Sequence, residues 1–88
     1  MEVSLIVPTY NESTNLEPLL SRIDMSLDGI PYEVIIVDDN SPDGTGALAE
    51  SLTDKYPVRV IHRSGKLGLA SAVVAGFAIA RGLILGCM

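Results

Sequence analysis

The chain has 88 residues, of which 48% are hydrophobic and 19% are charged, and its formal net charge is −5 at pH 7. This length allows one domain at most, and the composition is that of a folded protein rather than a disordered one. The acidic balance argues against a general nucleic-acid-binding protein, and the single cysteine excludes both a disulfide framework and a multi-cysteine zinc site.

The first predicted element is a buried strand from Val3 to Val7, which Pro8 ends because proline cannot donate to a sheet. A helix follows, since leucine and isoleucine recur at helical spacing from Leu16 to Leu27. Pro18 fits only in the first turn of a helix, so it restricts the start of this helix to within a residue or two.

Strands and helices continue to alternate along the rest of the chain. The second helix is expected to carry an apolar stripe from Ala47 to Tyr56 and to end before Pro57. The third helix is apolar on more than one face, so we expect it to be well buried. The remaining predicted ranges are strands Tyr32 to Val37 and Val58 to Ile61, a helix from Lys66 to Arg81, and a fourth strand that begins at Leu83.

This alternation predicts an α/β fold with a parallel sheet and helices on both of its faces. Such sheets bind ligands beyond the carboxyl ends of their strands, which here are the loops 8–14, 38–45 and 62–68. The fourth strand stops in an apolar run without a polar turn, so we expect a domain truncated after this strand. Its unfinished sheet leaves the oligomeric state open.

The loop after the first strand places an aromatic ring, an amide and a carboxylate at the binding edge. Tyr10 can pack against a base or a ribose, and Glu12 can accept hydrogen bonds from ribose hydroxyls. A plain helix-entry loop would explain Asn11 but neither Tyr10 nor Glu12.

Two aspartates follow the second strand. Successive strand residues point to opposite faces, so we expect only one of them to face a ligand, and we assign that contact to Asp39 rather than Asp38. Its carboxylate can accept from guanine, accept from ribose hydroxyls, or help to hold a cation. Asp43 and Gly44 are assigned mainly to turn formation.

The loop after the third strand brings Arg63 and Lys66 to the beginning of a helix, where free backbone amides favour anions. We therefore expect a phosphate group of a ligand to bind near Arg63 and Lys66. The segment is not a P-loop, because Lys66 is followed by Leu67. His62 has no partner at metal-ligand spacing, so a metal role is not expected.

Three motifs in order resemble the dolichol-phosphate mannosyltransferases of glycosyltransferase family 2: Pro-Thr-Tyr-Asn-Glu at 8–12, Val-Asp-Asp-Asn-Ser-Pro-Asp-Gly-Thr at 37–45, and Arg-x-x-Lys-x-Gly-Leu at 63–69. The resemblance implies that residues 1–88 are the N-terminal, Rossmann-like, nucleotide-sugar-binding part of a GT-A fold. It also implies a GDP-mannose donor, or a related nucleotide sugar, and a dolichyl or polyprenyl phosphate acceptor. By the family pattern, the donor nucleotide is contacted by Pro8, Tyr10, Glu12, Val37 and Asp39, with Arg63 and Lys66 in supporting roles.

The family continues into an Asp-x-Asp element that holds Mg²⁺ or Mn²⁺, and the resemblance puts those ligands, and the acceptor region, beyond residue 88. The fragment is therefore expected to contain no catalytic residue and to be inactive by itself. The N-terminus lacks a secretory signal pattern, which predicts a cytoplasmic location, and the lipid acceptor extends this to the cytoplasmic face of a membrane.

Two alternatives remain open at this point, a non-catalytic nucleotide-binding module and a phospho-accepting receiver domain. The receiver is suggested by the acidic pair after a strand, but receivers carry such a pair after the first strand and a phosphorylated aspartate after the third. The sugar, the base and the acceptor lipid also stay open, because relatives that use other donors share these motifs.

Overall fold

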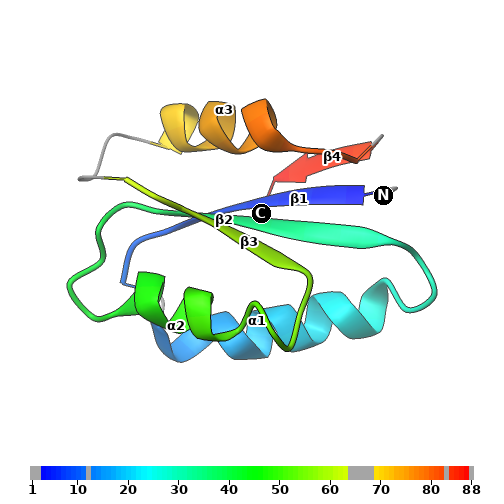
Figure 1. Ribbon diagram of the computed structural model, residues 1–88, viewed down its shortest axis with the longest axis horizontal. Helices are drawn as coiled ribbons and strands as arrows, with labels where there is room; N and C mark the ends of the chain where they lie inside the picture. The colour runs from blue at the N-terminus through cyan, green and yellow to red at the C-terminus, as the bar shows by residue number, and fades with distance from the viewer. Residues whose placement is uncertain (1–2, 12, 64–68, 83, 88) are drawn as a thin grey trace.

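The computed structural model describes residues 3–11, 13–63, 69–82 and 84–87. Strands and helices alternate along the chain, and the strands form one parallel sheet in the order β3-β2-β1-β4. Helix α3 covers one face of this sheet, and α1 and α2 cover the other (Figure 1). The predicted α/β fold is confirmed. The elements are β1 (Val3–Thr9), α1 (Ser13–Ser26), β2 (Tyr32–Asp38), α2 (Thr45–Ser51), β3 (Val58–His62), α3 (Leu69–Ile79) and β4 (Ile84–Cys87).

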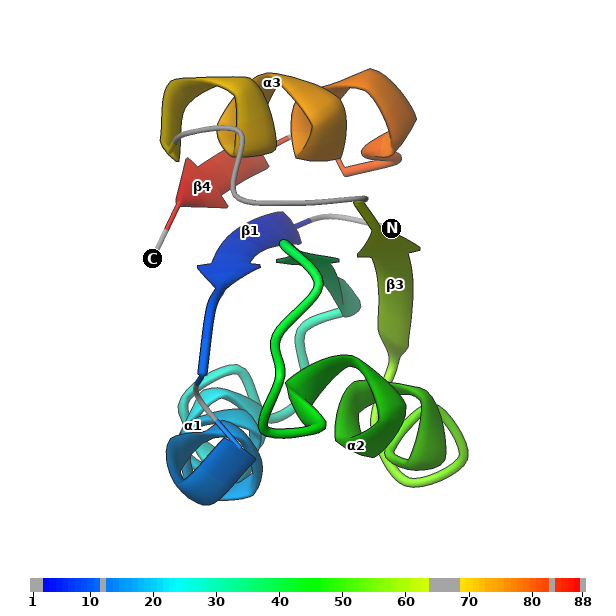
Figure 2. The same ribbon diagram turned by 90° about the vertical axis from the view of Figure 1, so that its left-hand side faces the viewer.

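The strand order changes direction at β1. The chain builds outward from β1 through β2 to β3, and β4 then pairs with the opposite side of β1. Figure 2 looks onto the carboxyl ends of the strands, which we call the carboxyl edge, and shows the loops that leave β1 and β2 there. Ligands of open parallel sheets bind outside this edge, next to the point where the order reverses.

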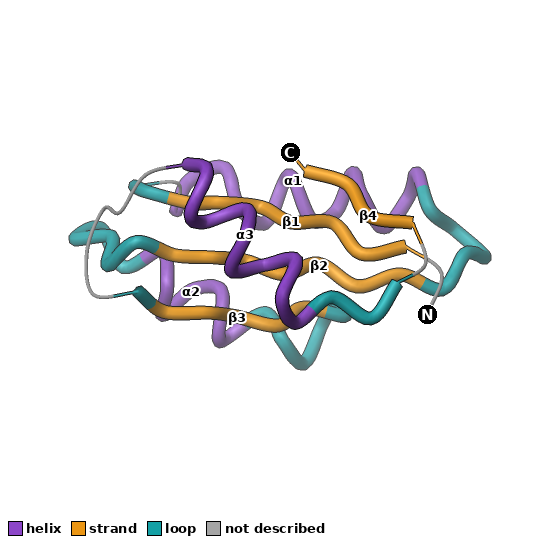
Figure 3. The backbone as a smooth tube through the Cα atoms, turned by 90° about the horizontal axis from the view of Figure 1, so that it is seen from above, coloured by secondary structure: helices purple, strands orange, loops and turns teal. Residues whose placement is uncertain are grey.

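Alternation along the strands gives the sheet two separate cores. On the face that carries α1 and α2, side chains such as Val7, Val34 and Ile36 pack against Leu16 and Leu20. On the other face, which we call the α3 face, α3 crosses over β1 and β2 (Figure 3). The buried residues of this smaller core are Ile6, Ile35, Val37 and Ala72.

Strand β1 continues through Pro8, so the prediction that Pro8 ends it is wrong. Pro8 lies opposite Val37 in the register with β2. The backbone of Thr9 faces β2, because its carbonyl accepts from the Asp39 N–H at 3.2 Å. The nitrogen of Pro8 must therefore face away from β2. Proline is tolerated here because no hydrogen bond of the β1–β2 ladder is lost.

Helix α1 begins at Ser13, earlier than predicted, so Pro18 lies inside it rather than in its first turn. An interior proline removes one backbone hydrogen bond and crowds the preceding turn. The apolar stripe outweighs this cost, since it is buried as expected against the sheet. Its most buried members are Leu16, Leu20 and Ile23.

Helix α2 is shorter than predicted, and α3 ends two residues before its predicted end at Arg81. Helix α2 ends at Ser51, so Tyr56 lies outside it, and Ala47 is exposed rather than part of the buried stripe. Helix α3 is less buried than expected, because Val74 and Phe77 point outward with exposed fractions of 66% and 40%. Within the ranges described, none of the helices has the length and hydropathy to cross a membrane.

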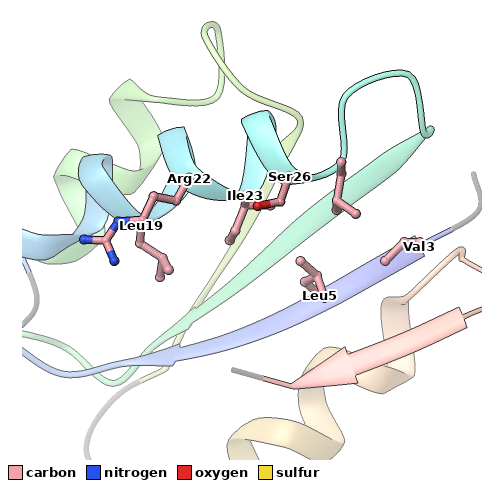
Figure 4. A pocket seen from close by; sticks show the side chains of 7 residues that line it. Val3, Leu5, Leu19, Arg22, Ile23 and Ser26 are labelled. Carbon is pink, nitrogen blue, oxygen red and sulfur yellow. The ribbon is translucent and has the colours of Figure 1, made fainter.

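A shallow apolar groove of about 290 Å³ runs between β1 and α1. Side chains of Val3 and Leu5 face those of Leu19 and Ile23 across it (Figure 4). Val3 and Leu5 belong to the first half of β1, so the groove lies away from the carboxyl edge. Its lining has few polar groups to orient a nucleotide, and it is not the predicted binding site.

Candidate functional site at the carboxyl edge

The predicted residues of β1 and β2 lie next to each other at the carboxyl edge. Pro8 and Val37 are partners in the strand register and share the α3 face. Pro8 is half-buried, whereas the side chain of Val37 is fully buried in the core beneath α3. The family pattern expects Val37 to contact the donor, but the structure gives its side chain a packing role, because α3 lies over it.

Asp39 and Arg63 form a two-point ion pair just beyond the ends of β2 and β3. The Arg63 Nε and Nη2 atoms donate to the two carboxylate oxygens at 2.5 and 2.9 Å. Both side chains are about nine-tenths buried. Arg63 Nη1 also donates to the Ser71 hydroxyl of α3 at 2.6 Å, which ties the pair to that helix. Hydrogen bonding to Asp39 raises the pKa of Arg63 above its ordinary value, although burial acts in the opposite direction.

Asp38 turns to the opposite side and organises the loops. Its carboxylate accepts from the Thr9 hydroxyl at 2.8 Å and from the Ser41 hydroxyl at 2.6 Å. Its second oxygen accepts from the Ser41 N–H at 3.1 Å. The expected division between the two aspartates is therefore present in the geometry: Asp38 faces the protein, and Asp39 lies on the α3 face. Ligand contact by Asp39 stays a prediction.

Tyr10 and Asp39 lie on two loops that are in contact. Tyr10 is 39% exposed, and Asn11 after it donates its N–H to the Ser41 hydroxyl at 3.0 Å. Asn11 and Asn40 each follow a predicted ligand residue and have φ angles of 56° and 54°. Asparagine tolerates this left-handed region better than most residues, so each loop turns sharply after its ligand residue.

Two predicted site residues, Glu12 and Lys66, lie outside the described residues, and their roles stay predictions. Sequence reasoning also missed Ser41, whose contact with Asn11 joins two loops 30 residues apart. No sequence signal identifies such a contact, because a serine in a turn is ordinary. Within residues 3–11, 13–63, 69–82 and 84–87, no three His, Cys, Asp or Glu side chains are grouped so that they could hold a metal ion.

The arrangement can be compared with known proteins. Residues 4–88 match the sequence model described as Glycosyl transferase family 2. The chain belongs to glycosyltransferase family 2. Family membership confirms the predicted family and removes the receiver-domain alternative.

One similar protein is the dolichol-phosphate mannosyltransferase of Pyrococcus furiosus, which is 56% identical over 82 residues, or 93% of this chain and 23% of that protein. Among solved structures, the mannosyltransferase PcManGT from Pyrobaculum calidifontis, in complex with GDP-Man and Mn²⁺, has a TM-score of 0.75 and 28% identity. The matched region covers 96% of this chain and 26% of the PcManGT chain. S. aureus TarS 1-349 in complex with UDP has a TM-score of 0.84 and 27% identity, with coverage of 100% and 27%.

These similarities confirm the predicted GT-A-type, Rossmann-like fold. The chain spans only 23% to 27% of the length of the three proteins. The two solved structures hold nucleotides with different bases, so the fold does not by itself select the donor.

Proposed function

We propose that this chain forms the donor-nucleotide half of a glycosyltransferase that moves mannose from GDP-mannose to a dolichyl or polyprenyl phosphate. The observation that carries the proposal is convergence at the carboxyl edge: Asp39 and Arg63 pair on the α3 face, and Tyr10 lies on the adjoining loop. The choice of mannose and of a lipid phosphate rests on the 56% identity to a dolichol-phosphate mannosyltransferase.

Each residue has a chemical role in this proposal. Tyr10 packs its ring against the base or the ribose, and the Asp39 carboxylate accepts from the two adjacent donors of guanine or from ribose hydroxyls. The Arg63 guanidinium fixes the plane of that carboxylate and favours its ionised form, in which both oxygens act only as acceptors. Pro8 forms a wall beside them, and Val37 supports that wall from the core. Glu12 and Lys66 are assigned to the ribose and the phosphates.

The transfer exchanges one bond for another at the anomeric carbon. An oxygen of the acceptor phosphate attacks this carbon while the bond to the β-phosphate oxygen breaks, and GDP leaves with the electron pair. The acceptor phosphate is anionic near neutral pH, so it needs no strong general base. When bound, Mg²⁺ or Mn²⁺ would stabilise the charge on the leaving diphosphate. The described residues hold no group of side chains that fits a metal site. Following the family pattern, we assign the metal ligands to an Asp-x-Asp element beyond residue 88.

A cytoplasmic location at a membrane surface belongs to the same proposal, because the acceptor is a lipid phosphate. The acceptor site is likewise assigned to residues outside this chain. The 88-residue chain is expected to bind the donor nucleotide without transferring its sugar.

Nucleotide binding by the chain tests the donor half of the proposal. Calorimetric titration should show binding of GDP and GDP-mannose, with weaker binding of UDP. Asp39→Asn should reduce the affinity for GDP at least roughly tenfold, because a charge-assisted acceptor is lost. Asp54→Asn is the matched control, because it removes the same negative charge from an exposed side chain in the turn that follows α2. GDP binding that is unchanged by Asp39→Asn would contradict the assigned site.

Transfer is tested in a chimera in which this chain replaces the matching 82-residue segment of the Pyrococcus furiosus enzyme. Labelled GDP-mannose and dolichyl phosphate should give a labelled lipid product, and Asp39→Asn should lower kcat/KM while Asp54→Asn should not. A folded chimera that binds GDP-mannose but forms no product would favour a non-catalytic nucleotide-binding module instead.

A further inference from the structure

The loop between β2 and α2 contains a carboxylate that reaches a second loop. Asp43 Oδ1 accepts from the backbone N–H of Thr45 at 3.0 Å and also from the Thr45 hydroxyl. Its other oxygen, Oδ2, accepts from the backbone N–H of Ser13 at 3.1 Å. Ser13 and Thr45 are the first residues of α1 and α2, so one side chain satisfies an N–H at the beginning of both helices.

These contacts tie together the two loops that carry the predicted donor residues. Ser13 ends the loop that contains Tyr10, and Asp43 lies in the loop that begins with Asp39. The same two loops are held together a second time by the hydrogen bond from Asn11 to Ser41, and Ser41 is bound in turn to Asp38. We call the contacts of Asp43 with Ser13 and Thr45 the Asp43 bridge. Along the chain, Tyr10 and Asp39 each lie between the end of a strand and a residue of this bridge.

The Asp43 bridge is a charged one. The hydrogen bond from the Thr45 hydroxyl lowers the pKa of Asp43 most, burial opposes this effect, and hydrogen bonds from Ser13 and the Thr45 backbone contribute to a pKa of about 2. The carboxylate is therefore ionised throughout the pH range of an ordinary binding assay. Hydrogen bonds from an amide to an ionised acceptor are shorter and stronger than those to a neutral one.

We propose that Asp43 is a positioning residue of the donor site: by holding Ser13 and Thr45 together, it fixes the spacing of the loops that carry Tyr10 and Asp39. This inference rests on the proposed function, because it assigns Asp43 to the same nucleotide site. It goes beyond a role in turn formation, since the bond to Ser13 joins residues 30 positions apart and contributes nothing to the local turn.

Asp43→Asn removes one link while keeping the shape of the side chain. An amide has a single acceptor oxygen, so it can serve either Ser13 or Thr45 but not both, and its nitrogen would face an N–H group. Asp43→Ala removes both links. Asp54→Asn is the matched control for the loss of a negative charge, as Asp54 is an exposed aspartate in another turn.

The experiment measures the affinity for GDP by calorimetry in the 88-residue chain. Four proteins are compared: the wild type, Asp43→Asn, Asp39→Asn and the variant that carries both substitutions. Asp43→Asn should weaken GDP binding roughly tenfold, the effect of one charge-assisted hydrogen bond. If Asp43 acts through the placement of Asp39, the same substitution should have a smaller effect once Asp39 is already changed. A general loss of stability would lower affinity equally in both backgrounds. Amide hydrogen exchange at Ser13 should also accelerate in Asp43→Asn and not in Asp54→Asn.

The outcomes separate the inference from the function on which it rests. If Asp39→Asn weakens GDP binding but Asp43→Asn does not, Asp43 positions nothing, and the inference alone is overturned. Equal effects of Asp43→Asn in both backgrounds would overturn it as well, because the residue would then act only on stability. If the wild-type chain and the chimera both fail to bind GDP or GDP-mannose, the proposed function is wrong and the inference is overturned with it.

Discussion

The two ends of the strand pair β2 and β3 carry the same kind of ion pair in different settings. At the amino end Glu33 pairs with Arg59 at 3.1 Å, and at the carboxyl edge Asp39 pairs with Arg63 at 2.5 Å. Both pairs lie on the α3 face, since Glu33 and Asp39 are six residues apart on one strand and its extension. The sequence already places them differently, because Asp39 and Arg63 follow their strands whereas Glu33 and Arg59 lie near the strand beginnings.

The amino-end pair is enclosed by the connection between α3 and β4. Glu33 Oε2 accepts from the Ser4 hydroxyl and from the Arg81 backbone N–H, each at 2.7 Å. Ser4 also accepts from the Gly82 N–H, and Arg59 donates to the carbonyl of Ile79 at the end of α3. Together these contacts join the amino ends of β1, β2 and β3, and they fasten the end of α3 and the residues after it to the sheet. The Asp39 pair instead lies beside loops at the edge where ligands of parallel sheets bind, and this difference in position separates a structural pair from a candidate site.

The largest predicted effect is at Glu33. Glu33→Ala removes the acceptor of a buried network and leaves the Ser4 hydroxyl and the Arg81 N–H without their partner. The free energy of unfolding should fall by about 3 kcal/mol, the usual cost of breaking a buried charged pair by removing one partner. Urea unfolding followed by circular dichroism measures this, with Glu17→Ala as the control at a half-exposed acidic residue. If Glu33→Ala lowered the free energy of unfolding no more than Glu17→Ala does, the structural role assigned to the amino-end pair would be contradicted.

Lowering the pH should remove the stabilisation that the Glu33 network provides. Burial would raise the pKa of Glu33, but hydrogen bonds from Ser4, Arg81 and Arg59 outweigh burial and hold the pKa below its ordinary value of 4.5. A lowered folded-state pKa gives stability that is complete above about 4.5 and is lost as the pH falls through the folded value. The gap in unfolding free energy between wild type and Glu33→Gln should therefore narrow as the pH falls below 4.5. If the difference in unfolding free energy stayed constant from pH 6 to values below 4.5, the stabilising role of the ionised Glu33 carboxylate would be contradicted.

Much of the fold followed from the sequence because it depends on local patterns. The apolar runs that form β2 and β3, and the stripe of α1, were predicted within one to three residues of their observed limits. The positions that failed depend on contacts between distant segments. Pro8 is allowed inside β1 because its nitrogen faces away from β2, and Pro18 is tolerated inside α1 because Leu16 and Leu20 are buried on either side of it.

The geometry of the candidate site was predictable to the same extent. The alternation of side chains along a strand predicted that Asp38 and Asp39 point to opposite faces, and the parallel sheet predicted that the loops after β1 and β2 would meet. That Asp39 contacts the donor stays a prediction. The burial of Val37 could not be predicted, because it depends on where α3 crosses the sheet. The hydrogen bond between Asp43 and Ser13 could not be predicted either, because turn formation alone explains an Asp-Gly sequence at positions 43 and 44.

The smallest predicted effect tests whether distance or burial decides the strength of an ion pair. Lys55 Nζ lies 2.8 Å from Glu17, closer than Arg59 lies to Glu33, and its side chain also lies 5.6 Å from the ring centre of Tyr56. Yet the Lys55 and Glu17 side chains are 62% and 46% exposed, so water and salt screen their attraction. Lys55→Ala should leave the urea midpoint within experimental error, at low salt and at high salt alike. A clear loss of stability at low salt, comparable to that of Glu33→Ala, would mean that short distance is sufficient, and burial could then no longer explain why the amino-end pair stabilises the fold.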